Sequence, residues 1–242
     1  MQTAIIADVH GNLTALDAVV ADIERRGPDR VVHGGDLALA GAQPAEVVDR
    51  IRELGWLGVV GNVDDLLWNP QQLEVQEARA PKLAPLLHLL FESYAPPTRE
   101  LLGEERPAWL RGLPAEHREG GLRVLHASPG DLWRAPMPDA PDSELLETYG
   151  PADGSAVVYG HIHLPFVRRL DSLTVANTGS VGNPFDGDPR AAYLLIDDGE
   201  PETIRVSYDI EREVSIVLES GYPDAARIAE MRRRGAFVAV EG

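Results

Sequence analysis

Seven side chains in this sequence combine the residue types and positions that metal chemistry requires. Each is an aspartate, asparagine or histidine that follows a predicted strand: Asp8, His10, Asp36, Asn62, His126, His161 and His163. These oxygen and nitrogen ligands suit divalent metals, so we expect Mn first, with Fe, Zn, Ni, Co or Mg as alternatives. Seven groups exceed the ordinary coordination of one ion and fit two ions that share a carboxylate. Two ions about 3.5–4 Å apart can hold a hydroxide for in-line attack on phosphorus.

The densest part of this pattern is Gly160-His161-Ile162-His163, which follows the apolar run 156–159. A short β-branched apolar run of this kind predicts a buried strand. Two histidines in the turn after a strand can aim at neighbouring points of one cleft. The spacing alone would also fit two ordinary loop histidines. The metal-site interpretation is favoured because three earlier strands also end in ligand-type residues.

The first 64 residues alternate between predicted strands and helices, which indicates a parallel sheet. The strands are 3–7, 30–36 and 56–60, and the helices are 13–25 and 44–54. Ligands of such sheets bind at the carboxyl ends of the strands. Asp8 and His10, Asp36, and Asn62 stand at these three ends in turn.

The pattern changes between residues 65 and 118, where prolines interrupt helical segments and no clear strand is visible. We predict a helical insertion that caps the mouth of the site; a helical pad on a sheet face is the alternative. The sheet is then expected to resume with strands 122–126 and 156–159. The short strands 166–170, 173–176, 191–196 and 203–208 predict a second, largely antiparallel sheet. Two helices, 211–218 and 223–234, form a predicted C-terminal segment 211–242, and the whole chain 1–242 is predicted to be one domain.

Five motifs in this order resemble those of the calcineurin-like metallophosphoesterases. The family pattern is D-x-H, G-D, G-N-H-D/E, H and G-H-x-H. It stands here as Asp8-Val9-His10, Gly35-Asp36, Gly61-Asn62-Val63-Asp64, His126 and Gly160-His161-Ile162-His163. The match runs from residue 1 to about residue 210. The segments 126–129 and 177–182 also resemble a bacterial branch that includes small phosphodiesterases and relatives of diadenosine tetraphosphatases.

The resemblance implies a ligand set and a fold. By it, Asp8, His10 and His163 hold a first metal ion, and Asn62, His126 and His161 hold a second. Asp36 bridges both ions, and we expect Asp36, Asn62 and His126 to act in catalysis. No further cofactor is expected. The implied fold is an α/β (α+β) four-layer α-β-β-α sandwich of two mixed sheets flanked by helices, here with a helical cap insertion.

Val63 departs from the family pattern, which has a histidine after the motif asparagine. By the resemblance, that histidine contacts the phosphate and protonates the leaving oxygen, and valine has no proton to give. A general acid contributes about 10²–10⁴-fold to a rate. Phosphodiesterases of the same superfamily also lack it, so Val63 indicates diesters or anhydrides as substrates.

Composition narrows the possible partners. The net charge of −17 argues against binding long nucleic acid through a basic surface, but not against a small phosphate ester. The chain has no cysteine, no apolar run of membrane-spanning length and no basic segment followed by an apolar stretch at its start. We therefore expect a cytoplasmic protein without a membrane partner; the oligomeric state stays open.

Several other residues have competing interpretations. Asp64 is expected to cap the helix after Asn62, with orientation of a ligand as the alternative. His33 is expected in the core or behind a ligand, and His88 and His117 on solvated helices or loops. Gly179, Ser180 and Gly182 are expected either to bring backbone near the metals or to form a tight turn. Arg190 is expected to form an ion pair or to contact phosphate, and residues 232–234 are expected at a helix C-terminus.

Three functions follow from these observations. The first is a dinuclear-metal phosphoesterase that hydrolyses small phosphodiesters or nucleotides by attack of a metal-bridging hydroxide. The second is a phosphatase that acts on monoesters or phosphoproteins. The third is a metal-binding scaffold, because the superfamily includes a retromer subunit that uses this fold for protein interactions. The ligand set of that subunit is eroded, whereas all seven positions are filled here.

Overall fold

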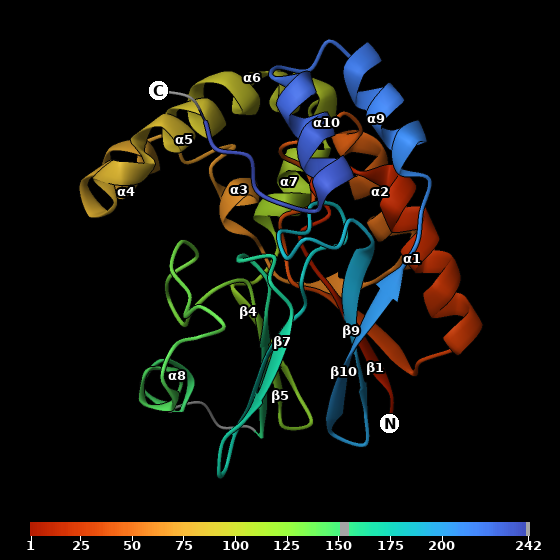
Figure 1. Cartoon of the computed structure of the whole chain (residues 1–242), viewed down its shortest axis with the longest axis vertical. Helices are drawn as coiled ribbons and strands as arrows, with labels where there is room; N and C mark the ends of the chain where they lie inside the picture. Colours follow the sequence, from red (N-terminus) through yellow and green to blue (C-terminus); the bar gives the residue numbers. More distant parts are fainter. Residues whose placement is uncertain (151–154, 241–242) are drawn as a thin grey trace.

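Two five-stranded mixed sheets form the centre of the computed structural model, which describes residues 1–150 and 155–240 (Figure 1). The strands are β1 (Thr3–Ile6), β2 (Arg30–His33), β3 (Leu57–Gly58), β4 (Glu116–Glu119), β5 (Leu122–Leu125), β6 (Ala156–Tyr159), β7 (Phe166–Arg169), β8 (Thr174–Asn177), β9 (Ala191–Asp197) and β10 (Glu200–Val206). The first sheet has the order β10-β9-β1-β2-β3, and the second has the order β4-β5-β6-β8-β7. The predicted domain 1–242 and segment 211–242 each include residues outside the described ranges.

Helices connect these strands and cover the outer faces of the sheets. They are α1 (Leu13–Arg26), α2 (Pro44–Leu54), α3 (Asn62–Asp65), α4 (Gln72–Arg79), η1 (Pro81–Leu83), α5 (Ala84–His88), the π-helix η2 (Leu89–Tyr94), α6 (Ala95–Leu102), α7 (Arg106–Arg111), α8 (Asp142–Tyr149), α9 (Ile210–Glu219) and α10 (Ala225–Arg234). None of the helices in the described part of the chain combines the length and apolar character that a membrane crossing requires.

The alternation of side chains along the strands produces the layers. Seven buried apolar side chains fill the space between the two sheets: Ile5, Val32, Val124, Val158, Ala176, Leu194 and Ile196. Ala4 and Ile6 are the neighbours of Ile5 on β1, and they belong to the larger core with α1 and α2. Val157 and Tyr159 flank Val158 on β6, and they belong to a third core with α8. Since successive strand residues face opposite sides, these cores separate four layers, and the predicted α-β-β-α sandwich is confirmed.

Two assignments of strands to sheets were wrong. β5 and β6 do not resume the first sheet but lie in the second, where they pair in parallel. β9 and β10 belong to the first sheet instead, because β9 pairs antiparallel with β1. Periodicity locates a strand and its buried face, but it carries no information about which neighbour supplies the hydrogen bonds.

The strand β4 lies in a segment that was predicted to be free of strands until Arg118. Its sequence is Glu-His-Arg-Glu, which has no apolar alternation. β4 forms because a tight turn at Gly120 and Gly121, both with positive φ, leads it back to pair antiparallel with β5. Pairing with a neighbour thus determines this strand, and its own composition does not.

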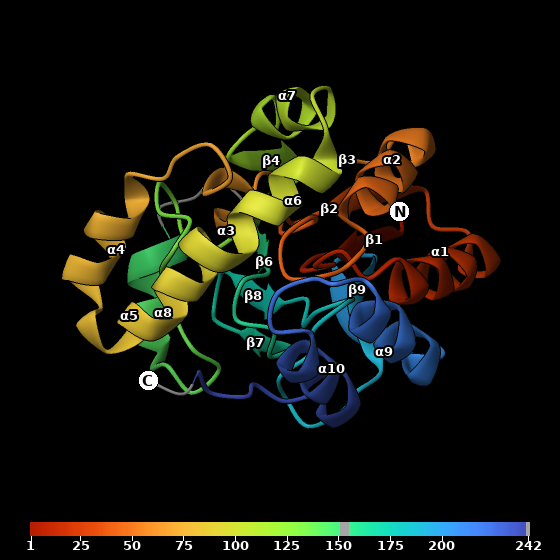
Figure 2. The ribbon, with the colours of Figure 1, turned by 90° about the horizontal axis from the view of Figure 1, so that it is seen from above.

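Helices from both halves of the chain lie above the sheets. Figure 1 shows α5, α6 and α10 at the upper end of the molecule, and Figure 2 shows this end from above. α5, η2 and α6 lie within the predicted insertion, 65–118, whereas α10 lies in the C-terminal segment. Both groups contribute side chains to the site described next.

Candidate metal centre

The structure brings together all seven residues that the sequence singled out. Asp8 and His10 follow β1, Asp36 follows β2, and Asn62 begins α3 shortly after β3. His126 follows β5 directly, and His161 and His163 follow β6. Six of the seven are buried and His161 is half-buried. Strand ends from both sheets therefore meet at one place, which the first sheet alone could not provide.

The backbone is unusual at five of these positions. Positive φ angles occur at Asp8 (58°), His10 (49°), Asp36 (54°), His161 (67°) and His163 (58°). Residues other than glycine rarely adopt this left-handed backbone conformation, and such backbone strain concentrates at functional sites. The turns after β1, β2 and β6 adopt it where it directs a polar side chain towards the common centre.

The first group of donors consists of Asp8, His10, Asp36 and His163. One ligand atom from each of these four buried residues lies within 4.8 Å of the others. The Nε2 atoms of His10 and His163 are 3.1 Å apart, and Nε2 of His163 lies 3.6 Å from Oδ1 of Asp8. This spacing is compatible with four ligands around one ion.

Hydrogen bonds on the far side of the rings determine which nitrogen faces the centre. Nδ1 of His10 donates to the carbonyl oxygen of Leu39 at 2.8 Å, and Nδ1 of His163 donates to that of Asn183 at 2.5 Å. A carbonyl oxygen only accepts, so in each neutral ring the proton is on Nδ1 and the lone pair is on Nε2. Two lone pairs that face each other at 3.1 Å require a cation or a proton between them. This arrangement fits a metal ion.

The second group consists of Asn62, His126 and His161. Oδ1 of Asn62 lies 2.7 Å from Nε2 of His126 and 3.1 Å from Nδ1 of His161. The opposite nitrogens of these rings donate to backbone carbonyls, those of Gly34 and Trp133. When both rings are neutral, the amide oxygen and the two inward nitrogens are acceptors that converge, as in the first group.

Asp36 lies between the two groups. Its Oδ2 is 3.9 Å from Nε2 of His10 in the first group and 3.4 Å from Nε2 of His126 in the second. Its other oxygen accepts a hydrogen bond of 3.0 Å from the backbone N–H of Val63, which fixes the plane of the carboxylate. Asp36 is the residue whose geometry suits a shared ligand.

Burial and charge displace the pKa values of these groups. Burial raises the pKa of Asp8 well above its ordinary value and lowers that of His10 to about 4. Burial also tends to raise the pKa of Asp36. The positive charge of His126 outweighs burial there and holds the pKa of Asp36 below its ordinary value. Burial likewise lowers the pKa of His126, yet Asp36 and Asp8 raise it to about 9. A divalent ion bound here would replace the His126 proton in offsetting these carboxylates.

Asp64 does not cap a helix as predicted. Its buried carboxylate accepts hydrogen bonds of 3.1 Å from the backbone N–H groups of Leu37 and Ala38. These amides directly follow Asp36, so Asp64 holds the turn that presents the shared carboxylate. The alternative, that Asp64 orients a ligand, agrees with these contacts.

The other histidines lie away from the centre. His33 is buried in the core, where its ring packs against Trp109 with 6.0 Å between the centroids. His88 has 45% of its side chain exposed and pairs with Glu92 at the end of α5, in agreement with the prediction of a solvated helix residue. His117 was wrongly predicted to be solvated, because it lies on β4 with only 16% of its side chain exposed.

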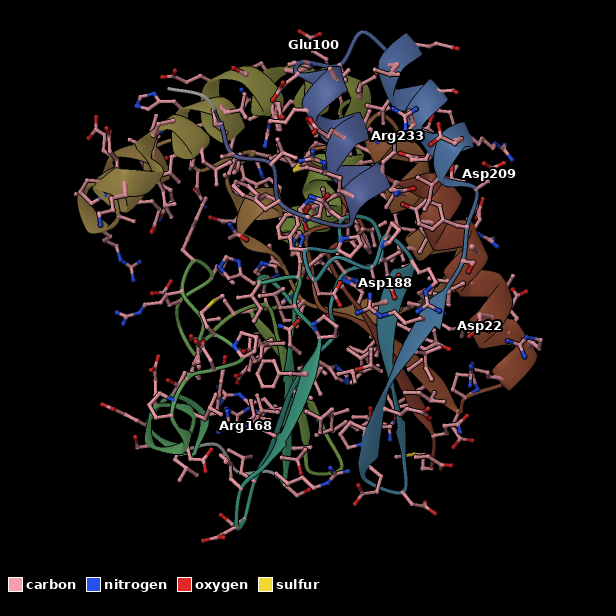
Figure 3. The ribbon with its side chains drawn as sticks, in the orientation of Figure 1. Asp22, Glu100, Arg168, Asp188, Asp209 and Arg233 are labelled. Carbon is pink, nitrogen blue, oxygen red and sulfur yellow. The ribbon has the colours of Figure 1, made fainter. Side chains whose placement is uncertain are left out.

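The loop after β8 packs against the backbone of the first group. Ser180 donates from its hydroxyl to the carbonyl of Asp8 at 2.7 Å, and the N–H of Gly182 donates to the same oxygen at 3.0 Å. A Cβ atom on Gly182 would lie 1.8 Å from the carbonyl oxygen of Val9, so only glycine fits there. Arg190, further along, pairs with Asp188, in agreement with the ion-pair interpretation. Figure 3 labels Asp188 beside β9.

Two features of the site were not found from the sequence. The first is Arg232, which was interpreted as part of a helix C-terminus; it does lie in the last turn of α10, but it is fully buried and contacts the site from behind. The second is a wall of mostly apolar side chains beside the donors, which includes Tyr94, Phe185, Arg227 and Phe237. The sequence could have indicated Arg232, because it lies on the apolar face of an amphipathic helix with no acidic residue one turn away. The wall could not be found in this way, because it depends on how distant segments pack.

Comparison with known proteins agrees with this geometry. The profile described as the calcineurin-like phosphoesterase superfamily domain matches residues 1–199. The chain is 31% identical over 244 aligned positions to the uncharacterized protein MJ0912 of Methanocaldococcus jannaschii, an alignment that covers 91% of this chain and 93% of that protein. The profile match contains all seven donors, and α9 and α10 lie beyond it.

Two solved structures resemble the whole chain. A metallophosphoesterase from Sphaerobacter thermophilus superposes with a TM-score of 0.79 at 26% identity and covers 98% of this chain and 99% of its own. The hypothetical protein PH1004 from Pyrococcus horikoshii OT3 superposes with a TM-score of 0.82 at 20% identity, with the same coverage, and shows a shared fold. Both matches extend over the C-terminal helices that the family profile does not include.

Proposed function

This chain belongs to the calcineurin-like phosphoesterase superfamily, and we propose that it hydrolyses small phosphodiesters or nucleotides with two divalent metal ions. The observation that carries the proposal is the division of seven donors into two groups with Asp36 between them. Divalent ions in such a site supply an activated water for in-line attack and offset the charge of the phosphate oxygens. We expect Mn in preference to Fe, Zn, Ni, Co or Mg, since these ligands accept several metals.

The protein's own residues then have distinct tasks. Asp8, His10 and His163 would hold one ion, and Asn62, His126 and His161 would hold the other. Asp36 would then offset positive charge on both. The backbone contacts of each ring keep the unprotonated nitrogens directed inward, so little reorganisation accompanies binding.

Val63 supports diesters over simple monoesters as substrates. The valine side chain lines the same cavity as the donors and has no proton for a leaving oxygen. Substrates with acidic leaving groups, such as aryl diesters or nucleotide anhydrides, do not need that proton. The substrate should be small, because a net charge of −17 opposes a long polyanion. The lack of cysteine fits a reducing compartment, and we place the activity in the cytoplasm.

A pair of aryl phosphates tests this function. The purified protein, supplied with Mn²⁺, should hydrolyse bis(4-nitrophenyl) phosphate faster than 4-nitrophenyl phosphate, which has the same leaving group. Elemental analysis of the metal-loaded protein should give two ions per chain. Faster turnover of the monoester would favour the phosphatase alternative, and a protein that binds metal but cleaves neither ester would favour the scaffold.

A further inference from the structure

A cavity of about 160 Å³ adjoins the seven donors. Five of them line one side: His10, Asp36, Asn62, His161 and His163. The other side is built by segments that carry none of the donors. Leu86 and Leu90 come from α5 and η2, Met231 comes from α10, and Phe237 comes from the stretch after α10. The insertion and the C-terminal segment thus form one wall opposite the donors.

Two phenylalanine rings, Phe185 and Phe237, extend from the predicted metal ligand His163 to the solvent-exposed side of this cavity. Phe185 stacks on His163 with ring centroids 4.4 Å apart and an interplanar angle of 20°. Phe237 meets Phe185 edge-on at 5.5 Å and 78°, and 46% of Phe237 is exposed. Flat apolar groups bind favourably against such rings. This surface therefore suits the organic part of an ester whose phosphorus lies among the donors.

Arg227 supplies positive charge to the same wall. Its Nε donates to Asp224, one Nη2 hydrogen goes to the hydroxyl of Tyr94 at 2.7 Å, and Nη1 donates to the carbonyl of Val238 at 2.9 Å. A guanidinium has five N–H groups, and the second hydrogen of Nη2 has no acceptor among the described residues. Arg227 is thus fixed in place and still has a donor for a ligand.

Tyr94 is not a substitute for the histidine that Val63 replaces. Its hydroxyl donates to Asp224 at 3.1 Å and accepts from Arg227. Burial raises the pKa of Tyr94 above its ordinary value, so the phenol keeps its proton. Among the groups that line this wall, Arg227 is the one able to offset negative charge on a leaving oxygen without transferring a proton.

We propose that this cavity is a leaving-group subsite for one aromatic ring of a phosphodiester, with Phe185 and Phe237 against the ring and Arg227 beside the leaving oxygen. The inference rests on the proposed function. An apolar cavity of about 150 Å³ accommodates benzene. This cavity has a similar volume, about 160 Å³, but its donor side is polar, so there is room for one six-membered ring against the aromatic side chains, and a second nucleoside would lie outside. In the reaction, the oxygen of water bonds to phosphorus, its proton goes to solvent, and the aryloxide leaves with the electron pair of the broken P–O bond.

Two diesters that differ in the shape of the leaving group test the subsite. Methyl phenyl phosphate carries a flat ring, and methyl hexafluoroisopropyl phosphate has a leaving alcohol of comparable acidity without one. The wild-type protein with Mn²⁺ should prefer the phenyl ester. Phe237→Ala should lower kcat/KM for the phenyl ester by about 2- to 10-fold, the worth of one aromatic contact, and leave the other ester unchanged. Leu218→Ala, an equally exposed apolar residue on α9, is the matched control and should change neither.

Arg227 requires a conservative variant, because Arg227 also binds Asp224 and Val238. Arg227→Gln should lower kcat on both esters by about 10²-fold with little change in KM, and Arg227→Lys should recover part of this loss. Metal content and thermal stability of each variant show whether the fold is intact. As a measurement without turnover, phenylphosphonate should bind more tightly than methylphosphonate, and Phe237→Ala should reduce the difference.

The outcomes separate the two proposals. If the metal-loaded wild type cleaves neither diester, the proposed function and the subsite both fail. If it cleaves both at equal rates and Phe237→Ala alters neither rate, the phosphodiesterase stands and the subsite is wrong. Loss of Arg227 that affects only thermal stability would assign that residue a structural role and overturn its place beside the leaving oxygen.

Discussion

The guanidinium of Arg232 donates a hydrogen bond of 3.1 Å to the backbone carbonyl of His10, which lies 222 residues earlier in the chain. The same side chain also binds the carbonyls of Ala40 and Gly182. The carbonyl of Leu39, next to Ala40, fixes the ring of His10, and that of Asn183, next to Gly182, fixes the ring of His163. Helix α10 therefore holds the loops of the first donor group through one buried cation.

We expect Arg232→Met to destabilise the protein by about 3–5 kcal/mol, the usual effect of removing one partner from a buried charged network. The carbonyls of His10 and Ala40 would lose their donor, and that of Gly182 would keep only the amide of Asn12. The buried Glu213 would lose the positive charge that opposes the rise of its pKa on burial. Arg233→Met is the matched control, because Arg233, labelled in Figure 3, is exposed and pairs with Glu211 on α9, a solvent-screened contact that contributes little to stability. Urea unfolding measures both, and equal midpoints for the two variants would contradict the role of Arg232.

The donor residues were predictable because each stands at a strand end. Strand position and residue type are both local, so Asp8, Asp36 and Asn62 could be placed at one sheet edge from periodicity and topology rules. The division of the donors into two groups could not be predicted from local sequence, and the family resemblance supplied it. It now has separate geometric support in the 3.1 Å contact of the His10 and His163 nitrogens and in the contacts of Asn62.

The parts that the sequence did not predict depend on long-range pairing. Nothing in the run 191–197 indicates that it lies beside β1 and not beside β8, because both neighbours offer the same apolar face. Asp64 follows a glycine and an asparagine at a helix start, where capping is the usual role, and only the fold brings Leu37 within reach of it. The aromatic wall likewise needs residues 86–94, 185 and 237 to meet in space.

Asp36→Asn should remove most activity and weaken the binding of both metal ions. The carboxylate is the one donor near both groups, and an amide offers a single neutral oxygen in its place. Its packing volume is unchanged, so the variant should fold. Elemental analysis after dialysis, alongside turnover of bis(4-nitrophenyl) phosphate, measures both effects. Two tightly bound ions and near-normal turnover would show that Asp36 is not shared.

His33→Phe should make the protein less sensitive to acid. Burial, and then the charge of His117, lower the pKa of His33 to about 3, and neither ring nitrogen has a partner among the described residues. Because the folded pKa lies below the unfolded one, the stability it contributes is present above about pH 6.5 and is lost as the pH falls towards 3. At pH 5 this loss is about 2 kcal/mol for the wild type and absent in the variant.

The test compares how steeply the free energy of unfolding changes with pH in wild type and in His33→Phe. Absolute stabilities are not compared, because the ring packs tightly against Gly58 and the larger phenylalanine destabilises the variant equally at every pH. His88→Phe is the control, because the side chain of His88 is 45% exposed and Glu92 raises its pKa, so its contribution to stability changes with pH in the opposite direction. Urea unfolding at pH 5 and pH 7 provides both slopes. Parallel curves for wild type and His33→Phe would mean that His33 is not buried as a neutral ring.

Val63→His should restore leaving-group protonation. The valine is 5% exposed and lines the cavity beside Asn62, so an imidazole at this position faces the substrate. Poor leaving groups should gain up to about 10²-fold, while good leaving groups gain little because they leave without a proton. Val63→Phe controls for the added bulk, which itself costs about 1–3 kcal/mol in a packed wall.

The deciding measurement is the rate of diester hydrolysis plotted against the pKa of the leaving group, for wild type and Val63→His. The wild-type plot should be steep, since Arg227 can offset charge on a leaving oxygen but cannot give it a proton as readily as an imidazole. The histidine variant should flatten the plot and the phenylalanine variant should not. A flat wild-type plot would show that another group already protonates the leaving oxygen. A steep plot that Val63→His leaves unchanged would show that position 63 does not face that oxygen, and the role implied by the family would then fail at this residue.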